Sequence, residues 1–220
     1  MDDLKGSHVV VTGAGGALGK DVVAALSAAG AAVSGLDRSG TEFSVDLADP
    51  GRVTAALDVA RSERGPVFGL VHLAGGYQAG PVLETSAADM EAMMRLNVLL
   101  AGEMVRQVLP DMRKAKAGRI IAMGAFAALK SSANQSAYNA SKAALISFMK
   151  SVAEEVKGDG VSVITLLPTT LDTPANRQAM PDAEPNRWVK TSRVAQLIRF
   201  LLGDVGADLN GAEIALRGRL

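Results

Sequence analysis

Residues 12–19 read Thr12-Gly13-Ala14-Gly15-Gly16-Ala17-Leu18-Gly19. An apolar run of strand length, His8 to Thr12, comes before them, and a helical pattern from 17 to about 29 follows. Glycines between a strand and a helix let backbone N–H groups approach a pyrophosphate at the helix N-terminus, although they can also simply make the turn. The candidate phosphate-binding residues are Gly13, Gly15, Gly16, Ala17, Leu18 and Gly19.

Apolar runs of strand length alternate with longer stretches of helical period along the rest of the chain. We expect further strands at 32–36, 67–73, 119–123, 161–167 and 209–216. We expect further helices from Asp49-Pro50, from Thr85 or Ser86 to about 114, at about 136–157 and at 191–202. This pattern predicts one α/β domain over residues 1–220, a doubly wound parallel sheet with helices on both faces.

Composition narrows the choice of partner. The chain has no Cys, which excludes disulfides and thiolate metal sites, and its 23 Lys and Arg balance 23 Asp and Glu. Such a balance lacks the basic footprint of a nucleic-acid binder or a membrane anchor, so a small molecule is the expected partner.

No apolar run approaches the ~18 residues of a spanning helix, and the start at Met1 to Lys5 is acidic where a signal peptide is positive. We therefore expect a cytoplasmic protein.

Asp37 ends the second expected strand, 24 residues after Gly13. A carboxylate at this corner accepts hydrogen bonds from ribose hydroxyls and repels a 2′-phosphate, so NAD(H) is favoured as cofactor. Arg38 could instead pair with that phosphate or stack on adenine, which keeps NADP(H) as an alternative, or it could be an ordinary surface residue. Asp46 and Leu47 are candidates to cover the adenine edge, although Asp46 could equally begin a helix.

Tyr138 and Lys142 lie four residues apart on the helix expected at about 136–157, which puts them on one face. A phenol has a pKa near 10, and a cation within a few Å lowers that value. Tyr138 would then be a usable general acid at neutral pH. Many helices carry such a pair by chance, but together with the glycine turn about 120 residues earlier it indicates catalysis.

These residues together resemble the short-chain dehydrogenase/reductase family, and the resemblance covers essentially the whole chain. The matching motifs are Thr12 to Gly19, Leu73-Ala74-Gly75-Gly76, Asn97, Tyr138 to Lys142 and Asn210-Gly211-Ala212-Glu213. The resemblance implies a Rossmann fold and an NAD(P)-dependent oxidoreductase, commonly a homodimer or homotetramer formed through the two long helices.

The resemblance also implies roles for single residues. Tyr138 would be the proton donor or acceptor, Lys142 would hold the nicotinamide ribose and lower the pKa of Tyr138, and Asn97 would hold a water in the proton path. The residues that would border the cofactor further along are Ala74, Gly75, Gly76, Pro168, Thr170, Leu171 and Thr173. Residues 168–190 contain four prolines and little apolar periodicity, so we expect a mobile, lid-like loop with short helical pieces.

The chain departs from the family pattern where a serine hydroxyl is expected. The family's catalytic serine lies 13 residues before the tyrosine, and that position is Ala125. Loss of one hydrogen-bond donor to a reacting oxygen typically costs about 10² to 10³ in rate. Ser131 and Ser132 follow, but their spacing gives no reason to expect a replacement. Leu73 and Ala17 also replace an Asn and a Gly that are usual in the family.

One branch of the family, the dihydropteridine reductases, lacks this serine. Its resemblance to this chain lies in Asp37, in Ala74-Gly75-Gly76 followed by an aromatic residue, and in the run from Leu167 to Arg177. The resemblance implies reduction of a quinonoid dihydropterin by NADH, since an electron-poor ring accepts hydride without a polarised carbonyl. Asn97 fits the general family better, so two alternatives stay open: a carbonyl or alcohol dehydrogenase that tolerates Ala125, and a catalytically silent NAD(P)-binding sensor.

Three further interpretations concern side chains other than Tyr138 and Lys142. His8 and His72 stand in apolar runs with no second His nearby, so each is expected to be a satisfied structural residue, and no metal site is predicted. Asp172 precedes Thr173-Pro174 and is expected to form a turn. Tyr77 or Trp188 could stack on a flat substrate, although such residues more often simply pack.

Overall fold

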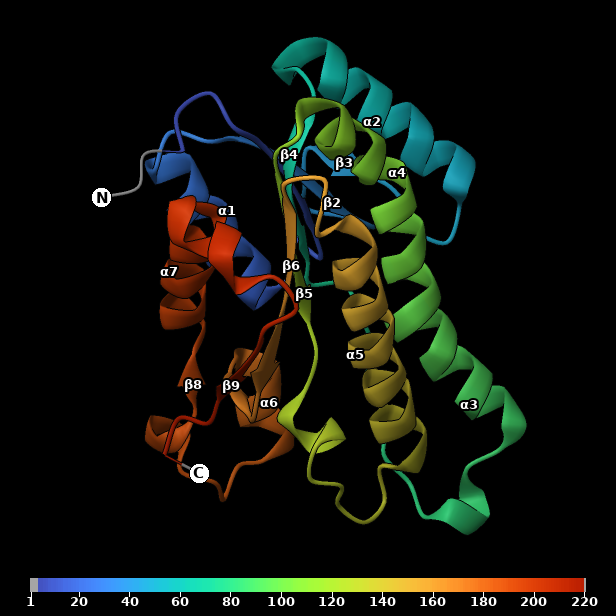
Figure 1. Cartoon of the computed structure of the whole chain (residues 1–220). Coiled ribbons are helices and arrows are strands. Elements are labelled where there is room, and N and C mark those ends of the chain that lie inside the picture. Colours follow the sequence, from blue (N-terminus) through green and yellow to red (C-terminus); the bar gives the residue numbers. More distant parts are fainter. Residues whose placement is uncertain (1–3, 220) are drawn as a thin grey trace.

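The computed structural model describes residues 4–219, so the acidic start at Met1 to Asp3 lies outside the described part. A seven-stranded sheet runs through the middle with helices on both faces (Figure 1). All its strand pairs are parallel, in the order β3-β2-β1-β4-β5-β6-β9. This is a single-domain, doubly wound Rossmann arrangement, as the alternating pattern predicts.

The strands of this sheet are β1 (His8–Thr12), β2 (Ala32–Asp37), β3 (Phe43–Ser44), β4 (Val67–His72), β5 (Gly118–Met123), β6 (Val161–Pro168) and β9 (Glu213–Leu216). The helices are α1 (Ala17–Ala28), α2 (Pro50–Arg64), α3 (Ala87–Met94), α4 (Leu100–Ala115), α5 (Ser136–Val156), α6 (Pro174–Ala179) and α7 (Thr191–Leu202). Two short strands, β7 (Leu171–Asp172) and β8 (Val189–Lys190), pair with each other apart from the main sheet.

Two hydrophobic cores hold the layers together, and β1 contributes to both. Val10 belongs to the core that contains residues of α2, α4 and α5, whereas Val9 and Val11 belong to the core shared with α1 and α7. Successive side chains of a strand point to opposite faces, so a strand buried on both faces must be apolar throughout. Burial of all five residues of β1 explains why a run this short predicts a central strand.

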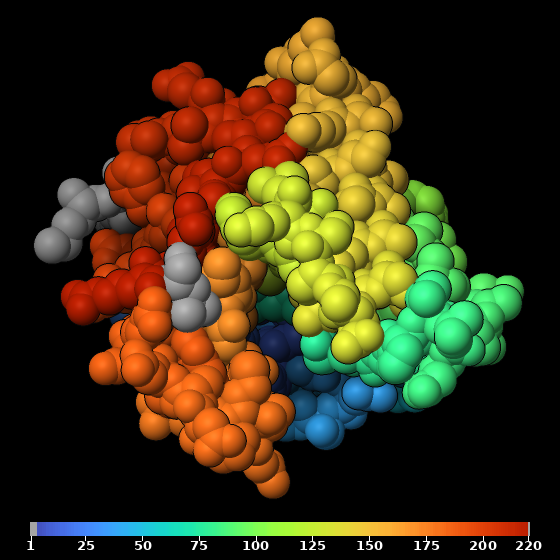
Figure 2. Space-filling model, turned by 90° about the horizontal axis from the view of Figure 1, so that it is seen from below, coloured from blue at the N-terminus to red at the C-terminus, as the bar shows by residue number. Residues whose placement is uncertain are grey.

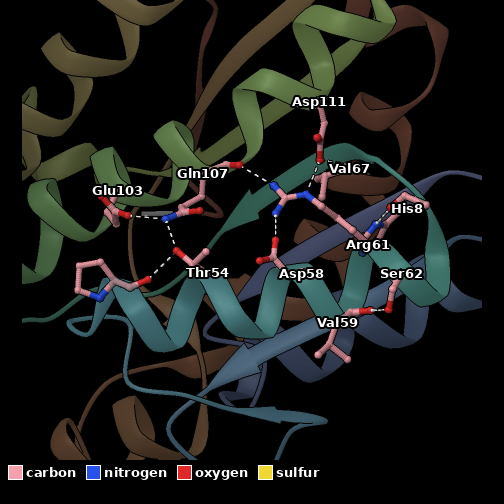
Figure 3. A network of polar contacts seen from close by, with 12 residues as sticks. His8, Thr54, Asp58, Val59, Arg61, Ser62, Val67, Glu103, Gln107 and Asp111 are labelled. Carbon is pink, nitrogen blue, oxygen red and sulfur yellow. Dashed lines mark hydrogen bonds and ion pairs between the residues drawn. The ribbon is translucent and has the colours of Figure 1, made fainter.

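A polar clamp ties α2 to α4 over the first of these cores (Figure 3). The Arg61 guanidinium donates to the Asp111 carboxylate at 2.8 Å and to the Gln107 carbonyl oxygen at 2.7 Å. The same carboxylate accepts the backbone N–H of Val67 at the start of β4. One half-buried carboxylate therefore fixes the positions of a helix, its neighbour and a central strand.

The structure corrects three expected elements. The helix expected from 86 to 114 is divided: Ser86 caps α3 through a capping box with Asp89, and a π turn, Arg95–Leu99, joins α3 to α4. The last strand is shorter than expected, because 204–209 forms a 3-10 helix. Residues 168–190 contain the expected short helical pieces, α6 and a 3-10 turn, and in addition the paired short strands β7 and β8, which were not expected. No helix in residues 4–219 is long and apolar enough to cross a membrane.

Candidate active site

The glycine turn between β1 and α1 allows contacts that larger residues would block. Gly13 has φ +68, and a Cβ on it would lie 2.9 Å from the backbone nitrogen of Ala74. A Cβ on Gly19 would lie 2.1 Å from the carbonyl oxygen of Gly13. Glycine at these positions therefore lets α1 begin directly against the ends of β1 and β4.

The start of α1 is suited to an anion. Gly16 is the N-cap residue, and within the described chain no side chain caps this helix and no acidic residue stands in its first turn. The side chain of Leu18 is buried in the core. Backbone N–H groups, rather than side chains, are thus what residues 17–19 offer to a phosphate, together with the positive end of the helix dipole.

A cavity of about 330 Å³ adjoins the glycine turn at the carboxyl ends of β1, β2 and β4. Eight of the predicted cofactor-binding residues line it: Gly13, Gly16, Asp37, Arg38, Asp46, Leu47, Ala74 and Gly75. Figure 2 shows the molecule hollowed at this end, with early residues in blue on the floor and residues of 170–190 in orange at the rim. The glycine cradle, the uncapped helix and this cavity together fit a dinucleotide.

Asp37 is held at this corner by two backbone donors. One carboxylate oxygen accepts the N–H of Gly15 at 3.0 Å and the other accepts the N–H of Arg38 at 2.7 Å. The side chain thus links the end of β2 to the glycine turn. Asp46 also lines the cavity, and its carboxylate accepts the N–H of Ala48 at 3.0 Å. The N-cap of α2 is Asp49, not Asp46.

Six residues that the sequence analysis missed also line the cavity: Val45, Ala48, Leu73, Arg95, Leu96 and Leu100. The last three come from the π turn and the first residue of α4. In the sequence, only the nearness of Arg95, Leu96 and Leu100 to Asn97 indicated that these three residues could belong to the site. Arg95 brings a cation to the same cavity as Arg38.

Lys142 is buried at the carboxyl edge of the sheet. Its ammonium donates to the carbonyl oxygen of Met123, the last residue of β5, at 2.8 Å. A Cβ on Gly75 would lie 3.3 Å from the same nitrogen, so the chain beyond β4 also passes beside it. Burial lowers the pKa of Lys142 from 10.5 to about 8. The predicted catalytic lysine therefore lies at the strand ends, as proposed, and its position depends on a backbone carbonyl.

Tyr138 stands one helical turn before Lys142, and its pKa differs from the sequence expectation. Burial, and secondly the neighbouring phenol of Tyr77, raise the pKa of Tyr138 to about 12. The rings of Tyr77 and Tyr138 meet edge to face, with centroids 4.9 Å apart and planes at 74°. The pKa is therefore raised where the sequence led us to expect a lowered one, because burial and the Tyr77 phenol both disfavour the phenolate.

Asn97 lies in the π turn and is fully buried. Its amide accepts the N–H of Gly76 at 2.9 Å, donates to the carbonyl oxygen of Gly76 at 3.0 Å and donates to the Ser141 hydroxyl at 2.9 Å. The side chain therefore positions the chain after β4 against α5. The implied role in holding a water stays a prediction, and both amide hydrogens already have protein partners.

Ala125 occupies the position of the expected serine and is buried immediately after β5. Ser131 and Ser132 are exposed in the segment before α5. Gln135, the N-cap of α5, donates its side-chain N–H to the phenol oxygen of Tyr77 at 3.1 Å. A second phenol and an amide thus stand close to Tyr138. The sequence indicated Tyr77 only as a residue that could stack on a flat substrate, and it gave Gln135 no role.

Residues 168–190 form a small folded flap at the end of β6. Pro168 ends β6, Thr170 accepts the N–H of Val189, Leu171 starts β7, and Thr173 caps α6. Asp172 does more than form a turn. Its carboxylate accepts from the Arg177 guanidinium at 2.6 and 3.0 Å and from the Lys190 ammonium at 2.5 Å. These two cations hold the pKa of Asp172 well below its usual range and join α6 to β8.

The two histidines differ. His8 is satisfied as expected, because its ring nitrogens bond to the carbonyl oxygen of Gly65 and the hydroxyl of Ser34. His72 bonds to the Thr12 hydroxyl through Nδ1, but its Nε2 finds no hydrogen-bond partner among residues 4–219. Burial, and secondly the charge of Lys142, lower the pKa of His72 to about 3. The described residues contain no group of three or more potential metal ligands.

Comparison with known proteins agrees with this geometry. A family model described as short chain dehydrogenase matches residues 7–184. Dehydrogenase/reductase SDR family member 6 from Xenopus laevis is 30% identical over 241 residues, covering 99% of this chain and 98% of that protein. The 2,3-dihydro-2,3-dihydroxybenzoate dehydrogenase of Escherichia coli strain K12 is 29% identical over 241 residues, covering 98% and 97%. A 3-ketoacyl-(acyl-carrier-protein) reductase from Brucella melitensis complexed with NADH has a TM-score of 0.87 at 23% identity, covering 98% of this chain and 99% of that one.

Proposed function

The chain belongs to the short-chain dehydrogenases, and on this premise we propose that it reduces a small molecule with Tyr138 as the proton donor. The observation that carries the proposal is the position of Lys142, whose ammonium bonds to the last residue of β5 and lies beside Gly75, a residue that lines the cavity. Tyr138 stands one helical turn before Lys142 on α5. The nicotinamide cofactor, when bound, supplies the hydride.

NAD(H) is the cofactor that this corner favours. The carboxylate of Asp37 is fixed by Gly15 and Arg38, so a negative charge stands where a 2′-phosphate would bind. Arg38 and Arg95 line the same cavity and are the groups that would accept NADP(H). The NADH in the Brucella melitensis structure supports the first choice by analogy.

Proton donation depends on the protonated phenol. With its pKa raised to about 12, Tyr138 carries its proton throughout the physiological range. The ammonium of Lys142, beside the chain after β4, is the group available to stabilise the phenolate once the proton has left. Asn97 holds the backbone of Gly76 in place through two hydrogen bonds. The flap of residues 168–190 is the candidate lid over the substrate.

For the substrate we propose an electron-poor conjugated ring, with a quinonoid dihydropterin as the first compound to test. Ala125 provides no hydroxyl to polarise a carbonyl oxygen, and hydride transfer to such a ring depends less on that hydrogen bond than reduction of a simple ketone does. Tyr77 is 61% exposed and offers an aromatic face to a flat molecule. A second candidate function is that of a carbonyl or alcohol dehydrogenase. The name of the similar 2,3-dihydro-2,3-dihydroxybenzoate dehydrogenase from Escherichia coli favours this candidate.

One experiment separates these candidates. Purified protein is mixed with NADH and offered quinonoid dihydropterin, an ortho-quinone and a panel of simple ketones, and the loss of NADH is followed. Consumption with the rings, lowered at least 100-fold by Tyr138→Phe, supports the proposal. Consumption with ketones alone favours the carbonyl dehydrogenase. Cofactor binding without turnover on any compound would identify a silent sensor.

We also propose that the protein is a homodimer or homotetramer. Leu99, in the π turn, is 57% exposed and gives this helical segment an apolar outer side chain suited to contact with a second copy. Light scattering of the purified protein measures the mass directly, and a species of 22.7 kDa would contradict this proposal.

A further inference from the structure

Tyr77 is exposed but fixed in place. The loop that carries it, residues 76–80, is tied at three points: Gly76 to Asn97, the Gln78 amide to the Asp89 carboxylate at 2.6 Å, and the N–H of Gly80 to the carbonyl oxygen of Asn134 at 2.8 Å. The side chain of Tyr77 is 61% exposed, so it forgoes much of the stabilisation that burial of an aromatic ring gives. The three ties hold the loop in place, so this exposure does not make the loop mobile. Such a side chain is better explained by contact with a ligand.

The phenol oxygen of Tyr77 has its acceptor capacity engaged. Gln135 donates its side-chain N–H to that oxygen at 3.1 Å. A phenol that accepts one bond still has its own O–H to donate. The edge-to-face contact with Tyr138, at 4.9 Å between centroids, keeps the Tyr77 ring against the ring of the proposed proton donor. The Tyr77 phenol also raises the pKa of Tyr138.

We propose that Tyr77 is a second catalytic residue whose O–H donates a hydrogen bond to the substrate, replacing the hydroxyl absent at Ala125, and that Gln135 is its positioning residue. This inference rests on the proposed function. It deepens it, because the substrate must then present an acceptor, a carbonyl oxygen or a ring nitrogen, to two phenols at once. The donor comes from the loop after β4, whereas Ala125 follows β5.

The test uses the full chain with NADH and the ring substrate on which the wild type is active. Tyr77→Phe keeps the aromatic ring and removes only the O–H. We expect kcat to fall about tenfold, less than the 10² to 10³ of a fully enclosed donor because Tyr77 is exposed. Gln135→Leu should produce a smaller fall. The matched control is Ser151→Ala, which removes an exposed hydroxyl from α5 far from the site and should leave kcat unchanged.

A rescue variant tests the replacement itself. Ala125→Ser should add little to the wild type but should recover most of the lost rate in the Tyr77→Phe background. An unchanged kcat for Tyr77→Phe, with a loss for Tyr77→Leu, would show that the ring acts by stacking and would overturn the proposal. Failure of Ala125→Ser to rescue Tyr77→Phe would also overturn it.

A readout without turnover completes the design. The chain has two tyrosines, so in Tyr77→Phe the signal of ring-labelled tyrosine in NMR belongs to Tyr138 alone. Since the Tyr77 phenol raises the pKa of Tyr138, its removal should lower that pKa. An unchanged pKa of Tyr138 in Tyr77→Phe would count against the proposal that the hydroxyls of the two tyrosines are adjacent. If Tyr138→Phe is fully active, the proposed function fails; if Tyr138→Phe is inactive and Tyr77→Phe is normal, only this inference fails.

Discussion

Asn97 and Gly76 are joined by two hydrogen bonds of opposite direction, one from the glycine N–H to Oδ1 and one from Nδ2 to the glycine carbonyl oxygen. An asparagine that pairs with one peptide unit in this way fixes its place and its orientation together. Gly76 stands in the sequence between Gly75, which lines the dinucleotide cavity, and Tyr77. The geometry of both halves of the site therefore depends on one buried amide.

Asn97→Asp should disrupt this pair. A carboxylate loses both N–H donors and places an acceptor against the Gly76 carbonyl oxygen in a fully buried position. We expect a loss of roughly 2–4 kcal/mol in unfolding free energy, together with weaker NADH binding, measured by denaturant titration and by fluorescence. Asn186→Asp, at an exposed position in the flap, is the control. Equal stability of the two variants would refute the structural role.

Gly19→Ala should damage the cofactor site through sterics alone. Its Cβ would lie 2.1 Å from the Gly13 carbonyl oxygen, so α1 would have to move away from the glycine turn. The expected cost is about 1–3 kcal/mol of stability, with at least a tenfold rise in the Kd of NADH. Gly158→Ala, whose Cβ meets nothing within 4 Å, should change neither quantity. Calorimetric titration with NADH measures the Kd, and similar affinities for the two variants would contradict the steric argument.

Asp37→Asn should remove the negative charge at the cofactor corner while keeping one of its two hydrogen bonds. The amide oxygen can still accept the N–H of Gly15, but the bond from the N–H of Arg38 is lost together with the charge. We expect the wild type to bind NADH more tightly than NADPH, and the variant to lose most of that preference. Arg38→Ala should shift the preference the other way. A wild type that prefers NADPH would show that Arg38 outweighs Asp37.

Lys142→Met should stabilise the fold while abolishing reduction. The pKa of Lys142 is lowered to about 8, so the folded state binds its proton less readily than the unfolded state, where the pKa is 10.5. The unfavourable contribution of the buried charge is therefore complete below pH 8 and disappears as the pH rises to 10.5. At pH 7 the variant should gain on the order of 1–3 kcal/mol, since loss of the bond to Met123 offsets part of the effect.

Denaturant titrations of both proteins at several pH values check this sign. The advantage of Lys142→Met should be largest below pH 8 and should shrink between pH 8 and pH 10.5, because the wild type becomes more stable over that range. An advantage that grows with pH would show that burial does not depress the lysine pKa. Lys150→Met, at an exposed position on the same helix, is the control.

Features set by local chemistry were predictable from the sequence. The apolar run of β1, the glycines after it and the cap at Ser86 each follow from a preference that acts over a few residues. The parallel sheet follows from the alternation of strands and helices. Eight residues of the cavity could be named in advance, some from the glycine turn and the end of β2, and Ala74 and Gly75 from the family resemblance.

Features that depend on distant contacts were not predictable. The bond between Gln135 and Tyr77 joins residues 58 positions apart, and neither side chain carries a motif. The raised pKa of Tyr138 depends on burial, which spacing alone does not reveal. Asp172 was expected only to form a turn, because the sequence does not show that Arg177 and Lys190, which come later in the flap, are its partners. Each case needs the tertiary structure before the residue acquires its role.

The π turn at Arg95–Leu99 also constrains how the chain can change in length. Such a turn holds one residue more than a turn of α-helix, and each helical residue advances by about 100°. Deletion of a single residue there would give an ordinary continuous helix. Either Asn97 would then turn away from Gly76, or Met104, Val108 and Met112 would rotate out of the core. The extra residue allows Asn97 to face Gly76 while the core residues of α4 still face the core.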